Sequence, residues 1–428
     1  MICLQISFYI SVSTVVCILL SLNTTHALSI NVTASSEEDS REVRARVKNF
    51  NIYNHQMIDM NGTIRKYFAV EGLLREPSNI VLSPLAAMLP IGKLYFGAGS
   101  ESKREIENAF GLGYADEIKR VLFNAISNMQ KLEGIQLNIA LFMLLPKYTE
   151  VKSEYKEKIS QLFHFNLQYV NFAHKTQVAD YTNYMLKVLT GGVTDKIVDP
   201  SEIESNSSLV VFNTCVFKGD WESPFEKVNN FIFTTGYLEK KKIDAYRVTS
   251  TTNYYSDELL KAELVSINFK AKEASLLIVL PFQSSSLDKV LNTIKEDPIL
   301  LQNAMSKMSL TVVQITVPKF QVETKADLKN LYMKVGIKKI FNSQDPGLTK
   351  LLVHGTPWVT SVRQLIKFRL RNMWVAGSAD NGGIMSFNSS SEPRKNFDVS
   401  KFFNANRPFL FYILHRGEQL FVGTIYDP

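Results

Sequence analysis

Residues 211–225 read VFNTCVFKGDWESPF, and this stretch carries the local pattern that bears most on the fold. The seven residues before Lys218 are mostly apolar, with β-branched and aromatic side chains, which predicts a buried strand over residues 208–217. The Lys218-Gly219 pair interrupts this pattern, and Trp221 and a Pro-Phe pair follow it. The stretch therefore predicts a buried strand that ends at a turn.

Helix and strand patterns alternate along the rest of the chain with no linker between them. Further strands are predicted over residues 275–280, 310–317, 365–370 and 409–414, and helices over residues 84–96 and 154–165. The 20 Gly and 14 Pro form no linker-like run, and no repeat of fixed period occurs. These patterns leave one large domain, with helices and strands interspersed, as an open option.

The composition excludes several classes of protein. With 45% hydrophobic, 21% charged and 11% aromatic residues, the chain is neither disordered, collagen-like nor disulfide-dense. The net charge of +7 is spread along the whole chain and is not concentrated in one block, so it gives no reason to expect a nucleic-acid partner.

The N-terminus carries a secretion signal. An apolar run from Ile10 to Leu22 precedes Thr25, His26 and Ala27, which predicts a signal peptide over residues 1–27 with cleavage after Ala27. An uncleaved membrane anchor is the alternative, because the apolar run is near the lower length limit for spanning a bilayer. The polar residues 28–48 are expected to form a mobile tail. We expect a secreted, extracellular protein with no membrane segment after cleavage.

Cysteine usage and glycosylation motifs fit this route. Cys3 and Cys17 leave with the signal peptide, so Cys215 stands alone and is expected to be a buried hydrophobic residue. A fold without internal disulfides needs a large core. Glycosylation is predicted at the four Asn-x-Ser/Thr motifs that follow the signal peptide, which begin at Asn31, Asn61, Asn206 and Asn388.

No pattern in the chain indicates catalysis. The nucleophile-elbow, phosphate-loop, His-Glu-x-x-His and paired-Cys motifs are all absent from the sequence. Five His residues remain after the signal peptide, too widely spaced for a local metal site: His55, His164, His174, His354 and His415. We expect no enzymatic activity, no catalytic residue, no metal and no cofactor.

Residues 376–400 differ from the rest of the chain. They contain Gly377, the Gly382-Gly383 pair, a run of three Ser residues and Pro393, and they lie between two predicted strands. A segment of this length without a structural pattern is uncommon inside a compact domain and is usually functional or disordered. The question of function therefore turns on this segment.

Several blocks resemble the serpin (serine protease inhibitor) superfamily, in the order in which that family has them. The matching blocks are residues 79–98 (NIVLSPLAAMLPIGKLYFGA), 182–195, 211–225, 317–341 (VPKFQVETKADLKNLYMKVGIKKIF) and 406–428 (NRPFLFYILHRGEQLFVGTIYDP). The resemblance implies a single α/β (mixed α+β) domain over residues 49–428 with a serpin fold of about nine helices around three β-sheets. It places residues 376–400 in an exposed reactive-centre loop. It also implies a monomer.

The resemblance implies a mechanism that needs no catalytic residue in the inhibitor. A protease attacks the loop and forms an acyl-enzyme, and the loop then inserts into the main sheet as a new strand and carries the protease with it. Inhibition is a race between strand insertion and hydrolysis of the ester, and the fold is metastable because the inserted state pairs more backbone.

The hinge where insertion begins departs from the pattern of inhibitory relatives. The family's Glu-Glu-Gly-Thr run falls on Asn372, Met373, Trp374 and Val375, and Trp at the Gly position resists the backbone turns that Gly permits. The resemblance also implies a hydrogen-bonded gate of polar residues beneath the sheet, and half of these residues differ here. Ser83 and Asn213 match the family pattern, whereas Ala86 and Gln364 replace a Ser and a His.

The position of the bait bond is ambiguous. Counting back from Phe403 and the Arg407-Pro408 pair indicates Arg394-Lys395, a bond suited to trypsin-like proteases. Counting forward from the hinge by the family's fixed length indicates Asn388, which also begins a glycosylation motif. Either the loop is longer than usual or the register is wrong. Arg394 and Lys395 can also be read as part of a solvated basic loop.

Two functions remain open from the sequence. The favoured one is a secreted serpin with weakened or lost suicide inhibition, acting as a protease substrate, binding or carrier protein. The alternative is a working covalent inhibitor of a trypsin-like serine protease with Arg394 as bait. A sulfated polysaccharide is a further candidate partner, through the Lys triplet Lys240, Lys241 and Lys242, although such a run is more often a solvated turn.

Overall fold

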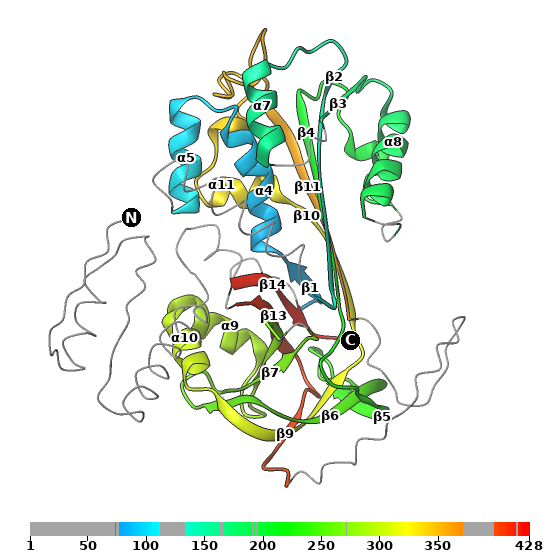
Figure 1. Cartoon of the computed structure of the whole chain (residues 1–428), viewed down its shortest axis with the longest axis vertical. Helices are drawn as coiled ribbons and strands as arrows, with labels where there is room; N and C mark the ends of the chain where they lie inside the picture. The colour runs from blue at the N-terminus through cyan, green and yellow to red at the C-terminus, as the bar shows by residue number, and fades with distance from the viewer. Residues whose placement is uncertain are drawn as a thin grey trace, which may run out of the picture. The chain divides into compact units, whose positions relative to one another are not determined.

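The computed structural model describes residues 73, 77–111, 133–162, 167–190, 192, 196–270, 272–370, 398–416 and 418–428. All of them belong to one compact unit, Ile58–Pro428. Helices and strands are interspersed along this unit, so the fold is of the mixed α+β kind that the alternating sequence patterns predict (Figure 1).

A five-stranded sheet forms one layer of the unit. Its strand order is β10 (Gln321–Asp327), β11 (Val359–Leu370), β4 (Leu209–Gly219), β2 (Ile135–Pro146) and β3 (Leu167–Val170). β11 and β4 are parallel, whereas β10 is antiparallel to β11 and β2 is antiparallel to β4. The long strands β2, β4, β10 and β11 run side by side through the upper part of the view in Figure 1.

A nine-stranded sheet forms the second layer. Its path is β1-β14-β13-β8-β7-β6-β9-β12, and β5 pairs with β6 outside this path. The bounds of these strands are β1 Ile80–Leu82, β5 Glu226–Thr234, β6 Lys240–Asp257, β7 Ala262–Asn268, β8 Ala274–Pro281, β9 Ser309–Pro318, β12 Lys401–Asn404, β13 Phe409–His415 and β14 Glu418–Ile425.

Two counts differ from those that the resemblance implied. By hydrogen-bond pairing the described strands form two sheets and not three, because the 18-residue strand β6 pairs with β5 near its start and with β7 near its end. The described part of the chain contains seven α-helices, whereas about nine were expected.

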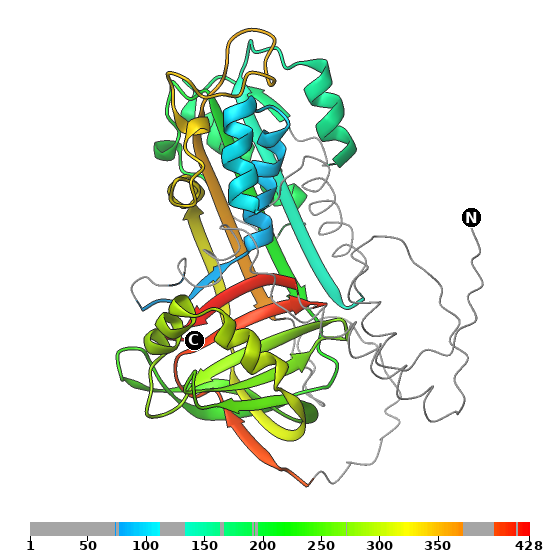
Figure 2. The ribbon, with the colours of Figure 1, turned by 90° about the vertical axis from the view of Figure 1, so that its left-hand side faces the viewer.

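The helices cover the sheets on different sides. α4 (Pro84–Tyr95), α5 (Ser100–Phe110), α7 (Ser153–Leu162) and α11 (Leu328–Lys334) lie on one face of the five-stranded sheet, and α8 (Lys175–Leu189) lies on the other (Figures 1 and 2). α9 (Leu287–Glu296) and α10 (Ile299–Ser306) pack against the nine-stranded sheet. Short 3₁₀ turns, η2 (Pro200–Glu202) and η3 (Lys339–Phe341), complete the described elements.

The central helix α4 begins where its sequence predicts. Ser83 is the N-cap, and its hydroxyl accepts a hydrogen bond from the Ala86 N–H, while Pro84 occupies the first helical turn. Every residue of α4 is buried, because the helix packs against β4 and β2 of the five-stranded sheet, against α5 and against β14, and contributes to both large apolar clusters. The helix is therefore part of the core and not a surface element.

The local predictions from the sequence are confirmed wherever the structure describes them. The strands predicted over 208–217, 275–280, 310–317, 365–370 and 409–414 are β4, β8, β9, β11 and β13, and the two predicted helices are α4 and α7. The signal peptide, the tail over 28–48 and most of the 376–400 segment lie outside the described residues.

Candidate functional site: the seam between strands β4 and β11

The seam between β4 and β11, the two parallel strands that carry the gate residues Asn213 and Gln364, is the candidate site for loop insertion. These parallel strands pair from Val359 and Leu209 at one end to Leu370 and Gly219 at the other, with one irregularity near Val359. Neighbouring strands lie about 4.8 Å apart, so a strand enters only if β4 and β11 separate by one further strand spacing. In this structure the seam is closed along its whole length.

The expected reactive-centre loop starts and ends at described strands. β11 ends at Leu370 in the five-stranded sheet, and β12 begins at Lys401 in the nine-stranded sheet, where it pairs with β9. The segment between them joins the two sheets. The candidate bait residues Arg394 and Lys395, the glycosylation candidate Asn388 and the hinge (Asn372, Met373, Trp374 and Val375) lie outside the described residues.

The three gate residues are all buried around the first turns of α4. Their exposed fractions are 2% for Ser83, 1% for Asn213 and 1% for Gln364. Asn213 of β4 and Gln364 of β11 are directly paired in the sheet register. Ser83 Oγ donates a hydrogen bond to the Leu420 carbonyl at 2.8 Å and so connects α4 to β14. The structure thus places these residues in one region beneath the seam.

Asn213 does not bond across the seam. Its Nδ2 donates to the carbonyl oxygen of Ala86 in α4, and its Oδ1 has no hydrogen-bond partner among the described residues. Neither Nε2 nor Oε1 of Gln364 has a partner there either. β4 is therefore fastened to the helix, whereas β11 contributes a buried amide without hydrogen bonds.

Pro90 explains why the Ala86 carbonyl is available. A proline has no N–H, so the carbonyl four residues before it loses its helical donor. Asn213 supplies a donor to that carbonyl, and the Tyr332 hydroxyl of α11 donates to the neighbouring Ala87 carbonyl at 2.6 Å. Neither Pro90 nor Tyr332 was expected from the sequence to take part in this site. A proline inside an otherwise helical apolar pattern was the available signal.

Cys215 is the small buried residue that its context predicts. It is free and fully buried on β4, and burial raises the pKa of its thiol far above the usual range, against the smaller opposing effect of Ser83. A thiol held in its protonated form is a poor nucleophile. Cys215 therefore belongs to the packing beneath the seam and has no covalent chemistry of its own.

The Lys triplet does not point in one direction. Lys240, Lys241 and Lys242 are consecutive on β6, so their side chains alternate between the faces of the strand. Lys241 Nζ lies 2.5 Å from Asp427 Oδ2, while Lys240 and Lys242 are exposed. The triplet thus forms a weaker anionic-ligand site than its spacing in sequence suggests.

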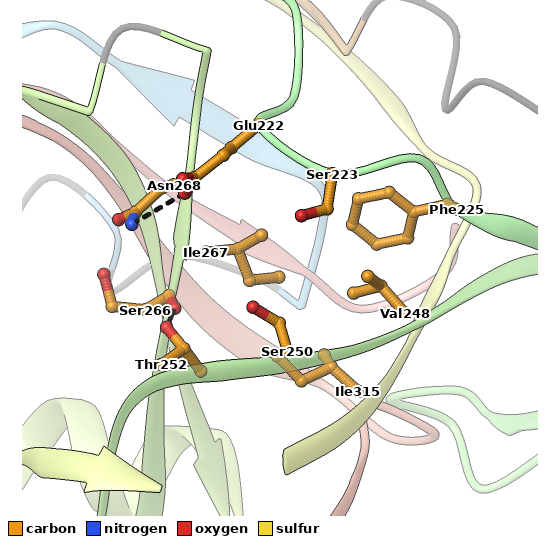
Figure 3. A pocket seen from close by; sticks show the side chains of 10 residues that line it. All are labelled: Glu222, Ser223, Phe225, Val248, Ser250, Thr252, Ser266, Ile267, Asn268 and Ile315. Carbon is orange, nitrogen blue, oxygen red and sulfur yellow. Dashed lines mark hydrogen bonds between the residues drawn. The ribbon is translucent and has the colours of Figure 1, made fainter. Parts of the chain in front are cut away.

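A shallow hollow lies where β6 diverges from β7 (Figure 3). It is lined by Glu222, Ser223, Phe225, Val248, Ser250, Thr252, Ser266, Ile267, Asn268 and Ile315. Its one charged side chain, Glu222, is already engaged by Lys272 at 2.9 Å and by the Asn268 amide at 3.1 Å. No lining residue carries a buried polar atom without a partner. The lining residues therefore present no buried, unpaired polar atom to a ligand.

No group of three or more His, Cys, Asp and Glu residues lies close enough to hold a metal ion in the described part of the chain. Likewise, none of the described helices is long and apolar enough to cross a membrane.

Comparison with known proteins identifies the family. The family model described as Serpin (serine protease inhibitor) matches residues 69–428. Antichymotrypsin-2 of Bombyx mori is 25% identical over 352 residues, covering 81% of this chain and 92% of that protein. Serpin I2 of Homo sapiens is 25% identical over 370 residues, covering 83% and 87% respectively.

Solved structures share the fold. The crystal structure of Manduca sexta serpin-12 matches with a TM-score of 0.71 at 23% identity, covering 86% of this chain and 99% of that one. Native protease nexin-1 with heparin matches with a TM-score of 0.70 at 24% identity, covering 88% and 100%. The family model covers most of the chain, and the solved structures share its fold. The chain belongs to the serpin family.

Proposed function

We propose that this chain is a secreted serpin whose suicide inhibition is weakened or lost, and that it acts as a protease substrate, binding or carrier protein without catalytic activity of its own. The observation that carries the proposal is the pairing of β4 and β11 up to their last residues, Gly219 and Leu370. A sheet paired to that point must first open at its Gly219 and Leu370 end before insertion can begin. Trp374, four residues beyond Leu370, replaces a hinge glycine and adds to this resistance.

A working inhibitor of a trypsin-like serine protease, with Arg394 as bait, is the second candidate. Gln364 favours it, because a buried amide with neither atom hydrogen-bonded destabilises the closed sheet. A new strand that supplies hydrogen-bond partners to this amide would lower the free energy of the sheet. The two candidates therefore differ in whether insertion outruns hydrolysis, not in whether the loop is attacked.

Incubation with trypsin separates the two candidates. We expect cleavage after Arg394 without a covalent complex on a denaturing gel, in both native and enzymatically deglycosylated protein. The double variant Arg394→Gln with Lys395→Gln is the matched control and should resist that cleavage, because trypsin also cleaves after lysine. A stable covalent complex of the parent that disappears in this double variant would establish the second candidate and refute the first.

We also infer the extracellular route from the sequence. Cleavage after Ala27 would leave a tail over residues 28–48 and a serpin domain over 49–428. Asn206 supports the use of at least one glycosylation motif, because it is exposed in a turn before β4. Secretion should yield a chain that begins at Leu28, and glycosidase treatment should lower its mass. An N-terminal sequence that begins at Met1 would contradict this inference.

A sulfated polysaccharide partner has support from a different group of lysines than the triplet. The pKa of Lys103 is lowered mainly by burial and further by the nearby Lys350 and Lys158, against the opposing effect of Glu107. The three lysines come from three separate segments. Clustered ammonium groups favour a polyanion. Lys103→Gln with Lys350→Gln should lower the salt concentration for elution from heparin, whereas Lys240→Gln with Lys242→Gln should lower it less. Elution of both doubles at the same salt as the parent would contradict the polysaccharide proposal.

A further inference from the structure

The connector between α8 and β4 lies over the seam on the face opposite α4. Its residues Ile197, Val198 and Ile203 belong to the same buried apolar cluster as Phe212 of β4 and Leu365 of β11. The connector therefore covers both strands that would have to part for insertion. α8 packs against β2 in the same cluster, and this contact fixes the position from which the connector starts.

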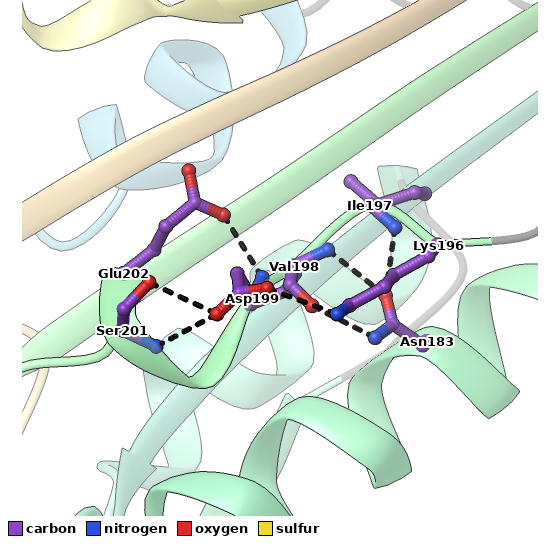
Figure 4. A network of polar contacts seen from close by, with 7 residues as sticks. All are labelled: Asn183, Lys196, Ile197, Val198, Asp199, Ser201 and Glu202. Carbon is purple, nitrogen blue, oxygen red and sulfur yellow. Dashed lines mark hydrogen bonds and ion pairs between the residues drawn. The ribbon is translucent and has the colours of Figure 1, made fainter.

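A hydrogen-bond network gives the connector a defined conformation (Figure 4). Asn183 of α8 accepts from the Ile197 and Val198 N–H groups at 2.8 and 2.9 Å and donates to the Val198 carbonyl at 2.9 Å. The carboxylate of Asp199 caps η2 through the Ser201 N–H, and Glu202 Oε2 accepts from the Asp199 N–H at 2.9 Å. Glu202 is thus held by the connector itself.

The same Glu202 carboxylate reaches the opposite strand. Its Oε1 lies 3.4 Å from Arg363 Nη1 of β11, and the two side chains are 37% and 33% exposed. Arg363 Nε is buried without a hydrogen-bond partner among the described residues. Because the connector leads directly into β4, this ion pair joins the β4 side of the seam to the β11 side.

Strand insertion is incompatible with this contact. Arg363 lies opposite Phe212 in the register, seven residues before the end of β11. A strand that fills the seam at that level moves β11 away from β4 by about 4.8 Å. The Glu202–Arg363 pair must break, or the connector must leave the sheet. Insertion can begin near Leu370 while the pair is intact, but it cannot pass Arg363 until the pair breaks or the connector leaves the sheet.

We propose that the Glu202–Arg363 ion pair is a latch that slows loop insertion midway along the seam. This inference rests on the proposed function and deepens it, because a latch at that level leaves time for hydrolysis of the acyl-enzyme. The two residues are positioning residues, since neither touches a protease or the scissile bond. The latch is electrostatic, so salt weakens it.

The test measures conversion to the heat-resistant, loop-inserted form after limited proteolysis of the 376–400 loop in the full mature chain. Glu202→Gln keeps an acceptor for the Asp199 N–H and removes the charge, and Arg363→Gln removes the other partner. Each should convert about two- to fivefold faster than the parent, in the range of an exposed ion pair. The double variant should convert no faster than either single one, because the two act through one contact.

Lys196→Gln is the matched control, because Lys196 pairs with Asp199 at 2.9 Å inside the connector and does not touch β11. It should convert at the parent rate. Raising the ionic strength from about 0.05 M to about 1 M should accelerate the parent and leave Glu202→Gln unchanged. Equal rates in the parent and Glu202→Gln, no conversion in any protein, or an equal acceleration in Lys196→Gln would each overturn the latch.

Amide hydrogen exchange in the uncleaved protein gives a second readout that does not require insertion. Residues 203–208 and 359–363 should exchange faster in Glu202→Gln and Arg363→Gln than in the parent and Lys196→Gln. Unchanged exchange would refute the latch. The proposed function fails by a different result, a stable covalent complex of the parent protein with trypsin, so the two failures can be told apart.

Discussion

Asn213 donates a hydrogen bond from β4 to the Ala86 carbonyl of α4, the one acceptor that Pro90 deprives of its helical donor. The carbonyl that the proline leaves unpaired in a buried helix thereby forms a hydrogen bond between that helix and the central strand of the sheet. The contact also draws Asn213 away from Gln364, its register partner across the seam. The closed seam is held by backbone pairing and by the latch, and the gate side chains do not bridge it.

Asn213→Ala should destabilise the protein by about 1–3 kcal/mol, because it leaves the buried Ala86 carbonyl without a donor. Denaturant unfolding of the intact protein measures this change. Pro90→Ala restores an intrahelical donor, so the double variant should recover part of the loss. The matched control is Thr214→Val, which removes a hydroxyl that has no partner among the described residues and should cost nothing. Additive effects of Asn213→Ala and Pro90→Ala would contradict this account.

Gln364→Leu should stabilise the closed form by about 1–3 kcal/mol, since it replaces a buried amide without hydrogen bonds by an apolar side chain of similar size. The same change should slow insertion, because a new strand would no longer supply hydrogen-bond partners to an unpaired amide and would stabilise the sheet less. Unfolding and the rate of conversion to the heat-resistant form check the two expectations. A loss of stability would mean that Gln364 is hydrogen-bonded to an ordered water.

Trp374→Gly should ease the start of insertion, because glycine permits the backbone turns that the hinge requires. We expect a larger fraction of covalent complex with trypsin and a faster conversion after cleavage. Combining it with Glu202→Gln should raise both further, since the hinge acts at the start of insertion and the latch acts midway. The hinge account is wrong if Trp374→Gly leaves both quantities at the parent level.

Lys93 should make stability depend on pH. This side chain of α4 is fully buried, and desolvation lowers the pKa of its ammonium from 10.5 to about 8. Between pH 8 and 10.5 the unfolded chain binds the proton and the folded chain does not, so the free energy of unfolding rises with pH in that window. Lys93→Met should be more stable than the parent by about 3 kcal/mol below pH 8, with a gap that closes toward pH 10.5.

Denaturant titrations at several pH values between 7 and about 10 test this expectation, with the difference between parent and Lys93→Met as the measured quantity. The difference removes contributions from other titrating groups. A constant difference across the window would show that Lys93 keeps its ordinary pKa in the folded protein.

The secondary structure was largely predictable because the long buried strands and helices carry strong local patterns. The run at 211–217 is apolar on both sides because β4 is buried on both faces, by α4 on one side and by α8 with its connector on the other. The sheet count was less predictable, because β6 passes from one group of strands to another without any break in its sequence pattern.

The candidate site was predictable only in part. Ser83, Asn213 and Gln364 could be placed near one another through the family resemblance, but their hydrogen bonds could not, since Pro90 redirects Asn213 to the helix. Glu202 and Arg363 carry no local signal at all. An ion pair between residues so far apart depends on how α8 and its connector pack over the sheet.

The sequence by itself determined which segments become strands and helices, the order of the blocks that place the chain among the serpins, and the departure of the hinge from the family pattern. These features depend on local periodicity and residue type. Only the tertiary structure decided that the seam is closed to Leu370, that Asn213 binds Ala86 and that Glu202 meets Arg363. Such contacts join distant segments, and their geometry is set by packing and not by spacing along the chain.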